Sequence, residues 1–276
     1  RWGTFWSVGG SWKATEEEFL RNVSWLNLLT LRASYGAQGN DNLGDDAYYN
    51  YYPLLNVNSN LGEGGTYRRL LYNPLLKWET NLNLNLGIDF ALLQNRLGGT
   101  VEFFQRKSKD LLYSQPLAPS IGYASVDQNV GALKNTGVDV TLHGVPVKTR
   151  NFSWTIDLNM THYKNKITEL PQQEIISGTK KLMVGRSIYD FWLREWAGID
   201  PATGLPLWYI NNADGTKATT GNYSAATQYY TGSSLPDVYG GFTNTFSYKG
   251  FSLSFLVAYS LGRKVLDQDY LFLRSE

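Results

Sequence analysis

The sequence predicts an all-β protein and, within that class, part of a large antiparallel β-barrel that crosses a lipid bilayer. Apolar and polar side chains alternate along several long segments. Short and long connections alternate between these segments. Aromatic residues make up 14% of the chain, yet the mean hydropathy is only −0.32. A membrane barrel combines these features because its outer surface is apolar while its interior stays polar.

The strongest strand prediction covers residues 81–92. A period of two over this length indicates a strand with one apolar face, because successive side chains of a strand point to opposite sides. The apolar positions are Leu82, Leu84, Leu86, Ile88, Phe90 and Leu92. The opposite face carries Asn81, Asn83, Asn85, Gly87, Asp89 and Ala91.

The same alternation predicts seven further strands, for a total of about eight. Many of them exceed the ~5–6 residues of a typical strand in a globular protein. The pattern is clearest in residues 137–142, 152–161 and 251–260. In chain order the seven segments are 2–12, 25–38, 96–113, 137–142, 152–161, 237–248 and 251–260.

The connections between these strands fall into two classes. One joint, residues 13–24, is longer than the tight turns and contains Thr15 and Glu18 in the spacing of a capping box, which predicts a short helix. Three others are expected to be tight hairpin turns, at residues 94–96, 148–151 and 249–250. The remaining three are long, at roughly 39–75, 115–126 and 170–235. This order predicts short periplasmic turns and long extracellular loops.

Aromatic spacing agrees with a bilayer. Trp2 and Trp12 are ten residues apart on one strand face, as are Trp25 and Tyr35. Ten residues at a rise of ~3.3 Å and a tilt of ~45° climb about 23 Å along the membrane normal. The apolar band of such a barrel is about 25 Å tall and is edged by two aromatic girdles. We therefore expect each pair to mark both edges of the band.

Charge and residue counts argue against several function classes. The 25 Lys and Arg nearly balance the 24 Asp and Glu, which argues against a nucleic-acid partner. The absence of Cys excludes disulfides, thiolate metal sites and cysteine nucleophiles. The two histidines, His143 and His162, are isolated in the sequence, so no metal site is expected. No catalytic triad or carboxylate dyad emerges, so we expect no catalytic residue, no cofactor and no enzyme activity.

Short motifs occur in a fixed order along nearly the whole chain. One is Asn135-Thr136-Gly137-Val138-Asp139, and the others lie at residues 31–36, 39–40, 76–80, 86–90, 95–97, 107–112, 198–200, 203–204 and 235–250. Their collinear order resembles the SusC/RagA-like TonB-dependent outer-membrane transporters of Bacteroidetes. The plug domain, the TonB-contact segment and the final strands of that family have no counterpart in the sequence.

The resemblance implies a barrel of about 22 strands with a plugged lumen, of which residues 1–276 would be one segment. It implies active import of an oligomeric nutrient, a glycan or a peptide, across the bacterial outer membrane, energised through TonB. The implied partners are a SusD-like surface lipoprotein, TonB and outer-membrane lipid, and the implied assembly is a dimer of transporter–lipoprotein pairs. Since the chain starts at Arg1 without Met, we expect it to belong to a longer protein.

The candidate ligand-binding residues lie in the long connections. Flat rings stack on sugar faces and peptide side chains, and their polar atoms form hydrogen bonds. For each residue taken singly, packing within the loop or against a lipoprotein lid is the simpler interpretation. The candidates are Tyr48, Tyr49, Tyr51, Tyr52, Trp192, Arg194, Trp196, Trp208, Tyr209, Tyr229 and Tyr230.

Three carboxylates fall on the polar faces of neighbouring predicted strands. Asp89, Asp139 and Asp157 are expected to face the lumen, where a charged side chain is solvated or pairs with the plug.

Two alternatives remain open at the level of the sequence. A passive porin-type channel would have the same architecture but no plug and no need for a proton gradient. A soluble or surface-displayed all-β binding module or adhesin would have shorter strands and fewer apolar faces turned outward.

Overall fold

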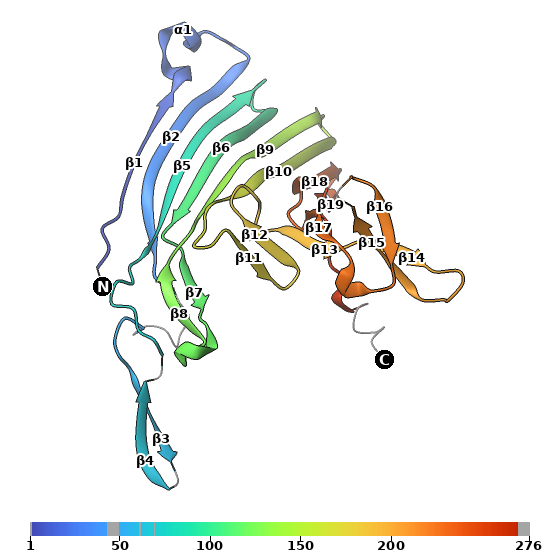
Figure 1. Cartoon of the computed structure of the whole chain (residues 1–276). Helices are drawn as coiled ribbons and strands as arrows, with labels where there is room; N and C mark the ends of the chain where they lie inside the picture. Colours follow the sequence, from blue (N-terminus) through green and yellow to red (C-terminus); the bar gives the residue numbers. More distant parts are fainter. Residues whose placement is uncertain (1, 43–49, 61, 69, 213, 270–276) are drawn as a thin grey trace.

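The computed structural model describes residues 2–42, 50–60, 62–68, 70–212 and 214–269. Eight antiparallel strands form one curved sheet in the order in which they occur in the chain (Figure 1). This confirms the all-β prediction and the eight strands. They are β1 (Trp6–Lys13), β2 (Leu26–Asn40), β5 (Glu79–Leu92), β6 (Leu97–Lys109), β9 (Ala132–Lys148), β10 (Phe152–Glu169), β18 (Val238–Tyr248) and β19 (Phe251–Leu261).

Several strand ends differ from the sequence prediction. The segment predicted at 137–142 belongs to the 17-residue β9, and β10 continues to Glu169. Strict alternation is needed only where one face of a strand meets lipid. Both strands therefore continue beyond the alternating segment with polar residues on both faces. The segment predicted at 96–113 is interrupted at Asp110, whose positive φ of 54° ends β6.

The short connections lie together at one end of the sheet (Figure 1). Lys249 and Gly250, with φ of 46° and 88°, form the two-residue hairpin between β18 and β19. Positive φ at both residues matches the right-handed twist of the strands that they join. The β1–β2 joint contains a 3₁₀ turn, Ala14–Glu16, and the short helix α1 (Glu18–Arg21).

The helix between β1 and β2 was predicted, but its capping box was wrong. Glu17 precedes α1 and makes no side-chain capping hydrogen bond. Thr15 lies inside the preceding 3₁₀ turn, and its buried hydroxyl has no hydrogen-bond partner among the described residues. The 3₁₀ turn shifts the helix start beyond Thr15, and for that reason the spacing from Thr15 to Glu18 does not form the motif.

The long connections lie at the other end, and their described residues form eleven shorter strands in four small sheets, together with two further 3₁₀ turns, Pro119–Ile121 and Tyr223–Ala225. The strands are β3 (Leu55–Asn60), β4 (Glu63–Arg68), β7 (Leu112–Pro116), β8 (Ser125–Asn129), β11 (Glu174–Ser177), β12 (Lys180–Met183), β13 (Asp190–Arg194), β14 (Trp196–Ile199), β15 (Pro206–Asn211), β16 (Lys217–Thr220) and β17 (Gln228–Ser233). The alternation of short and long connections is confirmed. None of the described helices is long and apolar enough to cross a bilayer.

One side of the large sheet, called the apolar face below, carries the alternating Leu, Ile, Val and aromatic side chains. Leu86 and Ile88, near the middle of this face, remain 45% and 44% exposed. No described element covers them, as a second sheet would in a soluble sandwich. The apolar face is therefore the lipid-facing surface of a membrane barrel.

The aromatic edges of the apolar face differ in part from the prediction. β1 begins at Trp6, so Trp2 lies outside the strand and is fully exposed. Trp6 takes its place at the loop end and packs edge-on against Tyr35, with ring centroids 5.5 Å apart. The prediction that Trp2 and Trp12 lie on one strand is wrong, because the chain joins the sheet only at Trp6.

Candidate functional site

The opposite side of the large sheet, called the polar face below, collects the polar positions of its strands. The strand register places Asp89 beside Thr100, Asp139 beside Glu102, and Asp157 beside His143. The three aspartates named from the sequence therefore share this face. The loop segment before β13 packs onto the same side, which is the inner side of the curved sheet (Figure 1).

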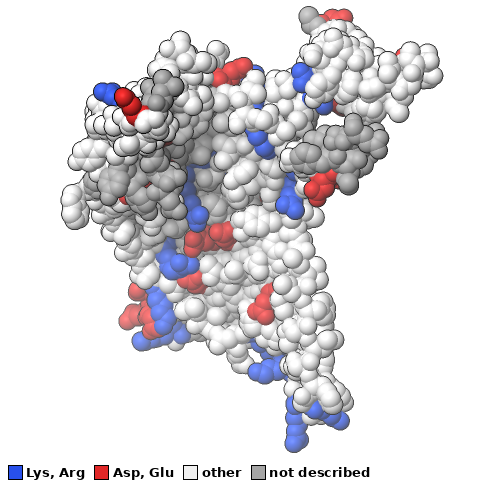
Figure 2. Space-filling model, turned by 90° about the horizontal axis from the view of Figure 1, so that it is seen from below, with Lys and Arg blue, Asp and Glu red and all other residues white. Residues whose placement is uncertain are grey.

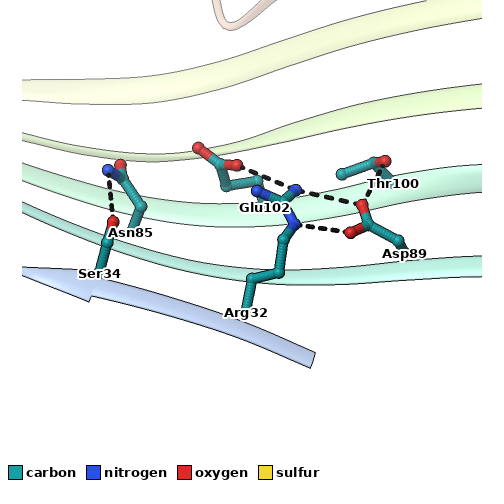
Figure 3. A network of polar contacts seen from close by, with 6 residues as sticks. All are labelled: Arg32, Ser34, Asn85, Asp89, Thr100 and Glu102. Atoms are coloured by element: carbon teal, nitrogen blue, oxygen red, sulfur yellow. Dashed lines mark hydrogen bonds and ion pairs between the residues drawn. The ribbon is translucent and has the colours of Figure 1, made fainter. Parts of the chain in front are cut away.

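Arg32 on β2 lies at the centre of a polar network on this face (Figure 3). Its Nε and Nη2 donate to the two carboxylate oxygens of Asp89 at 2.6 and 3.1 Å, and Nη2 also reaches Glu102 at 3.5 Å. Thr100 donates its hydroxyl to Asp89 at 2.7 Å. Gly87, directly opposite Arg32, leaves space for the guanidinium, because a Cβ there would lie 3.0 Å from it. The network thus joins three neighbouring strands.

The other carboxylates have different surroundings. Nδ1 of His143 lies 2.7 Å from a carboxylate oxygen of Asp157. Asp139 forms no ion pair among the described residues. No group of three or more His, Cys, Asp or Glu within the described ranges is placed to hold a metal ion.

We predict a measurable but modest coupling between Arg32 and Asp89. Their side chains are 42% and 25% exposed, so solvent screens the pair, and the coupling is expected to be about 1 kcal/mol. A double-mutant cycle with Arg32→Gln and Asp89→Asn, followed by urea unfolding of the full-length protein, measures it. Strictly additive effects of the two substitutions would show that the pair contributes no interaction energy.

A cavity of about 520 Å³ opens on the polar face where β6, β9, β10 and β18 lie side by side. We call it the wall pocket. Its lining includes Phe104, Arg106, Asp139, Tyr163, Tyr189 and Tyr239, and Asn135, Val140, Thr141, Asn159, Met160 and Thr161 complete it.

A row of rings crosses the wall pocket because one residue on β9 has no side chain. The ring of Phe104 lies over Gly137, where a Cβ would be 2.7 Å from the ring and 2.5 Å from a backbone oxygen of β10. Phe104 is 5% exposed, and its ring centroid lies 6.4 Å from that of Tyr163. Tyr239 meets Tyr163 edge-on at 6.4 Å, and the guanidinium of Arg106 lies 5.0 Å from the centre of the Phe104 ring.

The remaining wall of the pocket comes from a loop segment folded inward, residues 184–190. Backbone hydrogen bonds join Ile167 on β10 to Gly185 and Arg186, and Ile167 is only 1% exposed. The buried amide of Asn165 accepts hydrogen bonds from the backbone N–H of Ile188 at 2.9 Å and from the Ser187 hydroxyl at 3.2 Å, and it donates to Asn135 at 2.8 Å. These contacts hold Tyr189 at the pocket.

Removing this anchor is expected to release the inward-folded segment. Asn165→Ala deletes three hydrogen bonds to a buried amide and should destabilise the segment by about 1–3 kcal/mol. Hydrogen exchange at the amide of Ile188 measures the loss as faster exchange. Asn135→Ala removes only one of the three bonds and should accelerate that exchange less. Equal protection of Ile188 in Asn165→Ala and the unmodified protein would contradict the anchoring role.

Sequence reasoning identified Asp139 but missed the rest of the wall pocket. Phe104 occupies a polar-face position, so its apolar ring weakened the alternation of β6. Tyr189 lies in a long connection and reaches the sheet only because that connection folds back onto β10. The motif from Asn135 to Asp139 contained a signal for the pocket. Its Gly137 lies between two polar-face residues and has no side chain, which leaves space on that face.

The predicted ligand-binding residues fall into separate places. Tyr48 and Tyr49 lie outside the described residues. The rings of Tyr51 and Tyr52 are 4.5 Å apart, and Tyr52 is 55% exposed.

Five of the predicted residues are occupied by contacts within the long connection between β10 and β18. Trp192 meets Tyr230 edge-on at 4.9 Å, and the ammonium of Lys181 lies 4.4 Å from the Trp192 ring. The Tyr229 hydroxyl donates to Glu195. Tyr209 and Arg194 are similarly engaged, Tyr209 by Lys217 at 4.8 Å and Arg194 by the ring of Tyr223 at 4.4 Å. Such cation–ring contacts favour packing within the loop as the main role of these side chains.

Trp196 and Trp208 form a more accessible aromatic group on β14 and β15. Their rings meet edge-on at 6.0 Å, and Tyr223 adds a third ring 5.1 Å from Trp208. Trp196 and Tyr223 are 51% and 54% exposed. These rings remain available for contact with a ligand or a partner. Seen from this end, charged side chains form small groups of both signs (Figure 2).

The motif at residues 198–204 forms a turn. The carboxylate of Asp200 accepts hydrogen bonds from the Thr203 hydroxyl at 2.6 Å and the Ala202 N–H at 3.0 Å. These two donors, with the hydroxyl first, hold the pKa of the Asp200 carboxyl below its usual value. Gly204 follows with φ of 72°. The motif thus has a local structural role, in which the turn connects β14 to β15.

Comparison with known proteins gives a consistent result. Residues 1–268 match the family model described as TonB dependent receptor-like, beta-barrel. The chain is 32% identical to the TonB-dependent receptor SusC of Bacteroides thetaiotaomicron over 96% of its length, and 31% identical to the TonB-dependent receptor P26 of Formosa agariphila over 98%. It spans 28% and 29%, respectively, of the lengths of these relatives.

Solved structures agree with the sequence matches. The structure of the RagAB peptide transporter is similar over 94% of this chain, with a TM-score of 0.84 and 34% sequence identity. The RagAB peptide importer in its open-open state gives a TM-score of 0.82 at 31% identity. The chain covers 29% and 28% of the matched chains. These relatives are receptors and transporters.

Proposed function

Since this chain belongs to the TonB-dependent receptor-like β-barrel family of the outer membrane, we propose that it forms part of an active importer of oligomeric nutrients. The observation that carries the proposal is the match of residues 1–268 to a family model described as TonB dependent receptor-like, beta-barrel. The apolar face would meet lipid, and the polar face, with Asp89, Asp139 and Asp157, would line the lumen.

The chain would be one segment of a larger closed barrel of about 22 strands. β1 and β19 each have one edge unpaired among the described strands. Backbone groups at a sheet edge inside a bilayer have no water to bond, so both edges need further strands. The chain spans less than a third of its relatives, which agrees with this proposal. The plug and the segment that contacts TonB would belong to other parts of the protein.

The whole transporter would act with a SusD-like surface lipoprotein and with TonB, and transporter–lipoprotein pairs could assemble as a dimer. The similarity to SusC and to the RagAB peptide transporter supports this choice of partner and a glycan or peptide cargo. The exposed rings of Tyr52 and Trp196, with the half-buried ring of Trp208 beside Trp196, are the loop side chains best placed to contact cargo or the lipoprotein. No chemical reaction on the cargo is proposed.

The two alternatives have less support. A surface adhesin with a soluble sandwich fold would cover the row around Leu86 and Ile88, which is exposed. A passive channel would share the architecture, but the family match is to TonB-dependent receptors.

Uptake by intact cells tests the proposal. A strain lacking the full-length gene is compared with the complemented strain for uptake of oligosaccharide and peptide mixtures, with mass spectrometry of what disappears from the medium. We expect gene-dependent uptake of an oligomer that stops when tonB is deleted or a protonophore is added. Flux that persists under both treatments would support the passive channel, and unchanged uptake with altered surface adhesion would support the adhesin.

A further inference from the structure

We propose that a line of lysines on the outside of the barrel binds the phosphate groups of a lipid in the outer leaflet of the membrane. The line, called the lysine row below, consists of Lys107 on β6, Lys134 on β9 and Lys166 on β10. It lies toward the end of these neighbouring strands that leads into the long connections (Figure 1). The proposal concerns lipid rather than cargo and goes beyond the import function.

The strand register places the lysine row on the apolar face of the sheet. Lys107 pairs with Lys134, and Lys134 pairs with Lys166, so the three residues form one line across adjacent strands. Lys107 is four residues from Phe103, which pairs with Leu86 of the apolar face. Side chains four residues apart in a strand point to the same side. The lysine row therefore lies on the side that meets lipid, away from the lumen and the wall pocket.

The register also brings three like charges together. Neighbouring strands lie about 4.8 Å apart, and like charges directly opposite one another destabilise a sheet. None of the three lysines forms an ion pair among the described residues, and neither does Glu169 at the end of β10. An anion that lies over the row would replace the repulsion with charge-assisted hydrogen bonds.

No carboxylate on the same face is placed to be that anion. On the three strands, the residues that share the apolar face around the row are neutral, histidine or lysine. They carry no Asp or Glu within residues 101–109, 132–140 and 160–166. Two further lysines, Lys109 and Lys164, lie two residues from Lys107 and Lys166 on the same face. The anion must therefore come from outside the described residues.

The lysine row lies where the apolar band ends. Along β6, the residues on this face change from apolar to polar and then to charged toward the loops, in the order Val101, Phe103, Gln105, Lys107, Lys109. From Phe103 to Lys107 the strand climbs about 9 Å along the membrane normal, at ~3.3 Å per residue and a tilt of ~45°. Half of an apolar band of about 25 Å is only slightly more. A lysine side chain can place its ammonium group at the headgroups while its methylene groups stay among acyl chains.

This combination of charge and position favours a phosphorylated lipid over other anions. Lysine is a compact point charge that binds phosphate. The acyl chains of the same lipid would contact the apolar residues below the row, such as Phe103 and Val138, which are paired in the sheet. A free phosphate ion would gain nothing from that apolar surface. An acidic protein surface could meet the charges, but the lipid-facing side continues directly below them.

Native mass spectrometry of the full-length protein with its lipoprotein partner tests the proposal, with diphosphorylated lipid A added to the detergent solution as the probe. We expect lipid A to bind, and its dephosphorylated form to bind weaker by about tenfold or more, because the charge-assisted contacts are lost. The triple variant Lys107→Gln, Lys134→Gln, Lys166→Gln should lose affinity for lipid A by a similar factor and no longer distinguish the two forms. Inorganic phosphate at the same concentration should not displace lipid A.

The matched control is the triple variant Lys148→Gln, Arg150→Gln, Lys249→Gln, which removes the same charge from the short turns at the opposite end of the barrel. Its affinity for lipid A should be unchanged. Urea unfolding in phosphatidylcholine vesicles shows whether the row variant folds, and without lipid A we expect it to be at least as stable as the unmodified protein, since repulsion is removed.

Four results would overturn the proposal. They are equal binding of the two forms of lipid A, equal losses in the two triple variants, displacement of lipid A by inorganic phosphate, and a row variant that is less stable than the unmodified protein without lipid A. Unchanged lipid A binding by the row variant, with loss of the lipoprotein or of a second copy from the complex, would also overturn it and assign the lysines to a protein interface.

Discussion

Replacing Leu86 with arginine is expected to lower the free energy of unfolding of the full-length barrel by about 2–4 kcal/mol. Leu86 lies in the middle of β5 on the apolar face and is 45% exposed, with no described element over it. An arginine there would place a charge among acyl chains. Urea unfolding in lipid vesicles, followed by tryptophan fluorescence, measures the change.

The neighbouring residue is the matched control for this prediction. Asn85 points to the polar face, where its amide donates to the hydroxyl of Ser34 at 3.3 Å (Figure 3). Asn85→Arg would keep its charge in a polar environment and should cost far less. Similar losses for the two variants would mean that the two faces are wrongly assigned.

Gly137→Ala is expected to have the second-largest effect, a loss of about 1–3 kcal/mol together with distortion of the wall pocket. The added Cβ would lie 2.5 Å from a backbone oxygen of His162 and 2.7 Å from the Phe104 ring. The first contact can be relieved only if β9 and β10 move apart, and the second only if the Phe104 ring leaves its place. Unfolding in urea measures the loss.

Gly144→Ala on the same strand is the control for Gly137→Ala. The nearest atom to its added Cβ is a backbone oxygen of Ile156 at 4.0 Å, an ordinary contact. We expect almost no change in stability. If both alanine variants unfold alike, the close approach at Gly137 does not limit the packing of the sheet.

Local pattern was enough to predict the large sheet. Alternation along 81–92 and its counterparts identified all eight strands and separated Leu86 from Asp89. Tight turns such as Lys249-Gly250 were also readable, because their residue types match a particular backbone geometry. Strand ends were less predictable, since alternation stops where lipid stops and the strands β9 and β10 continue beyond it.

Contacts between residues far apart in the chain could not be predicted from the local sequence pattern. Arg32 and Asp89 are 57 residues apart and meet only because β2 and β5 pair in one register. Tyr189 reaches the wall pocket through a loop that folds back onto Asn165 and Ile167. The small sheets of the long connections were likewise missed, because their strands of four to six residues show no sustained period.

The sequence by itself determined which side chains face lipid and which face the interior, because that choice repeats every second residue and needs no partner. Only the tertiary structure decided which polar residues meet. Strand register and loop docking set the distances between side chains that are far apart in the chain. These distances pair Arg32 with a carboxylate, and they place the opposite charges of Asp139 and Arg106 at one pocket.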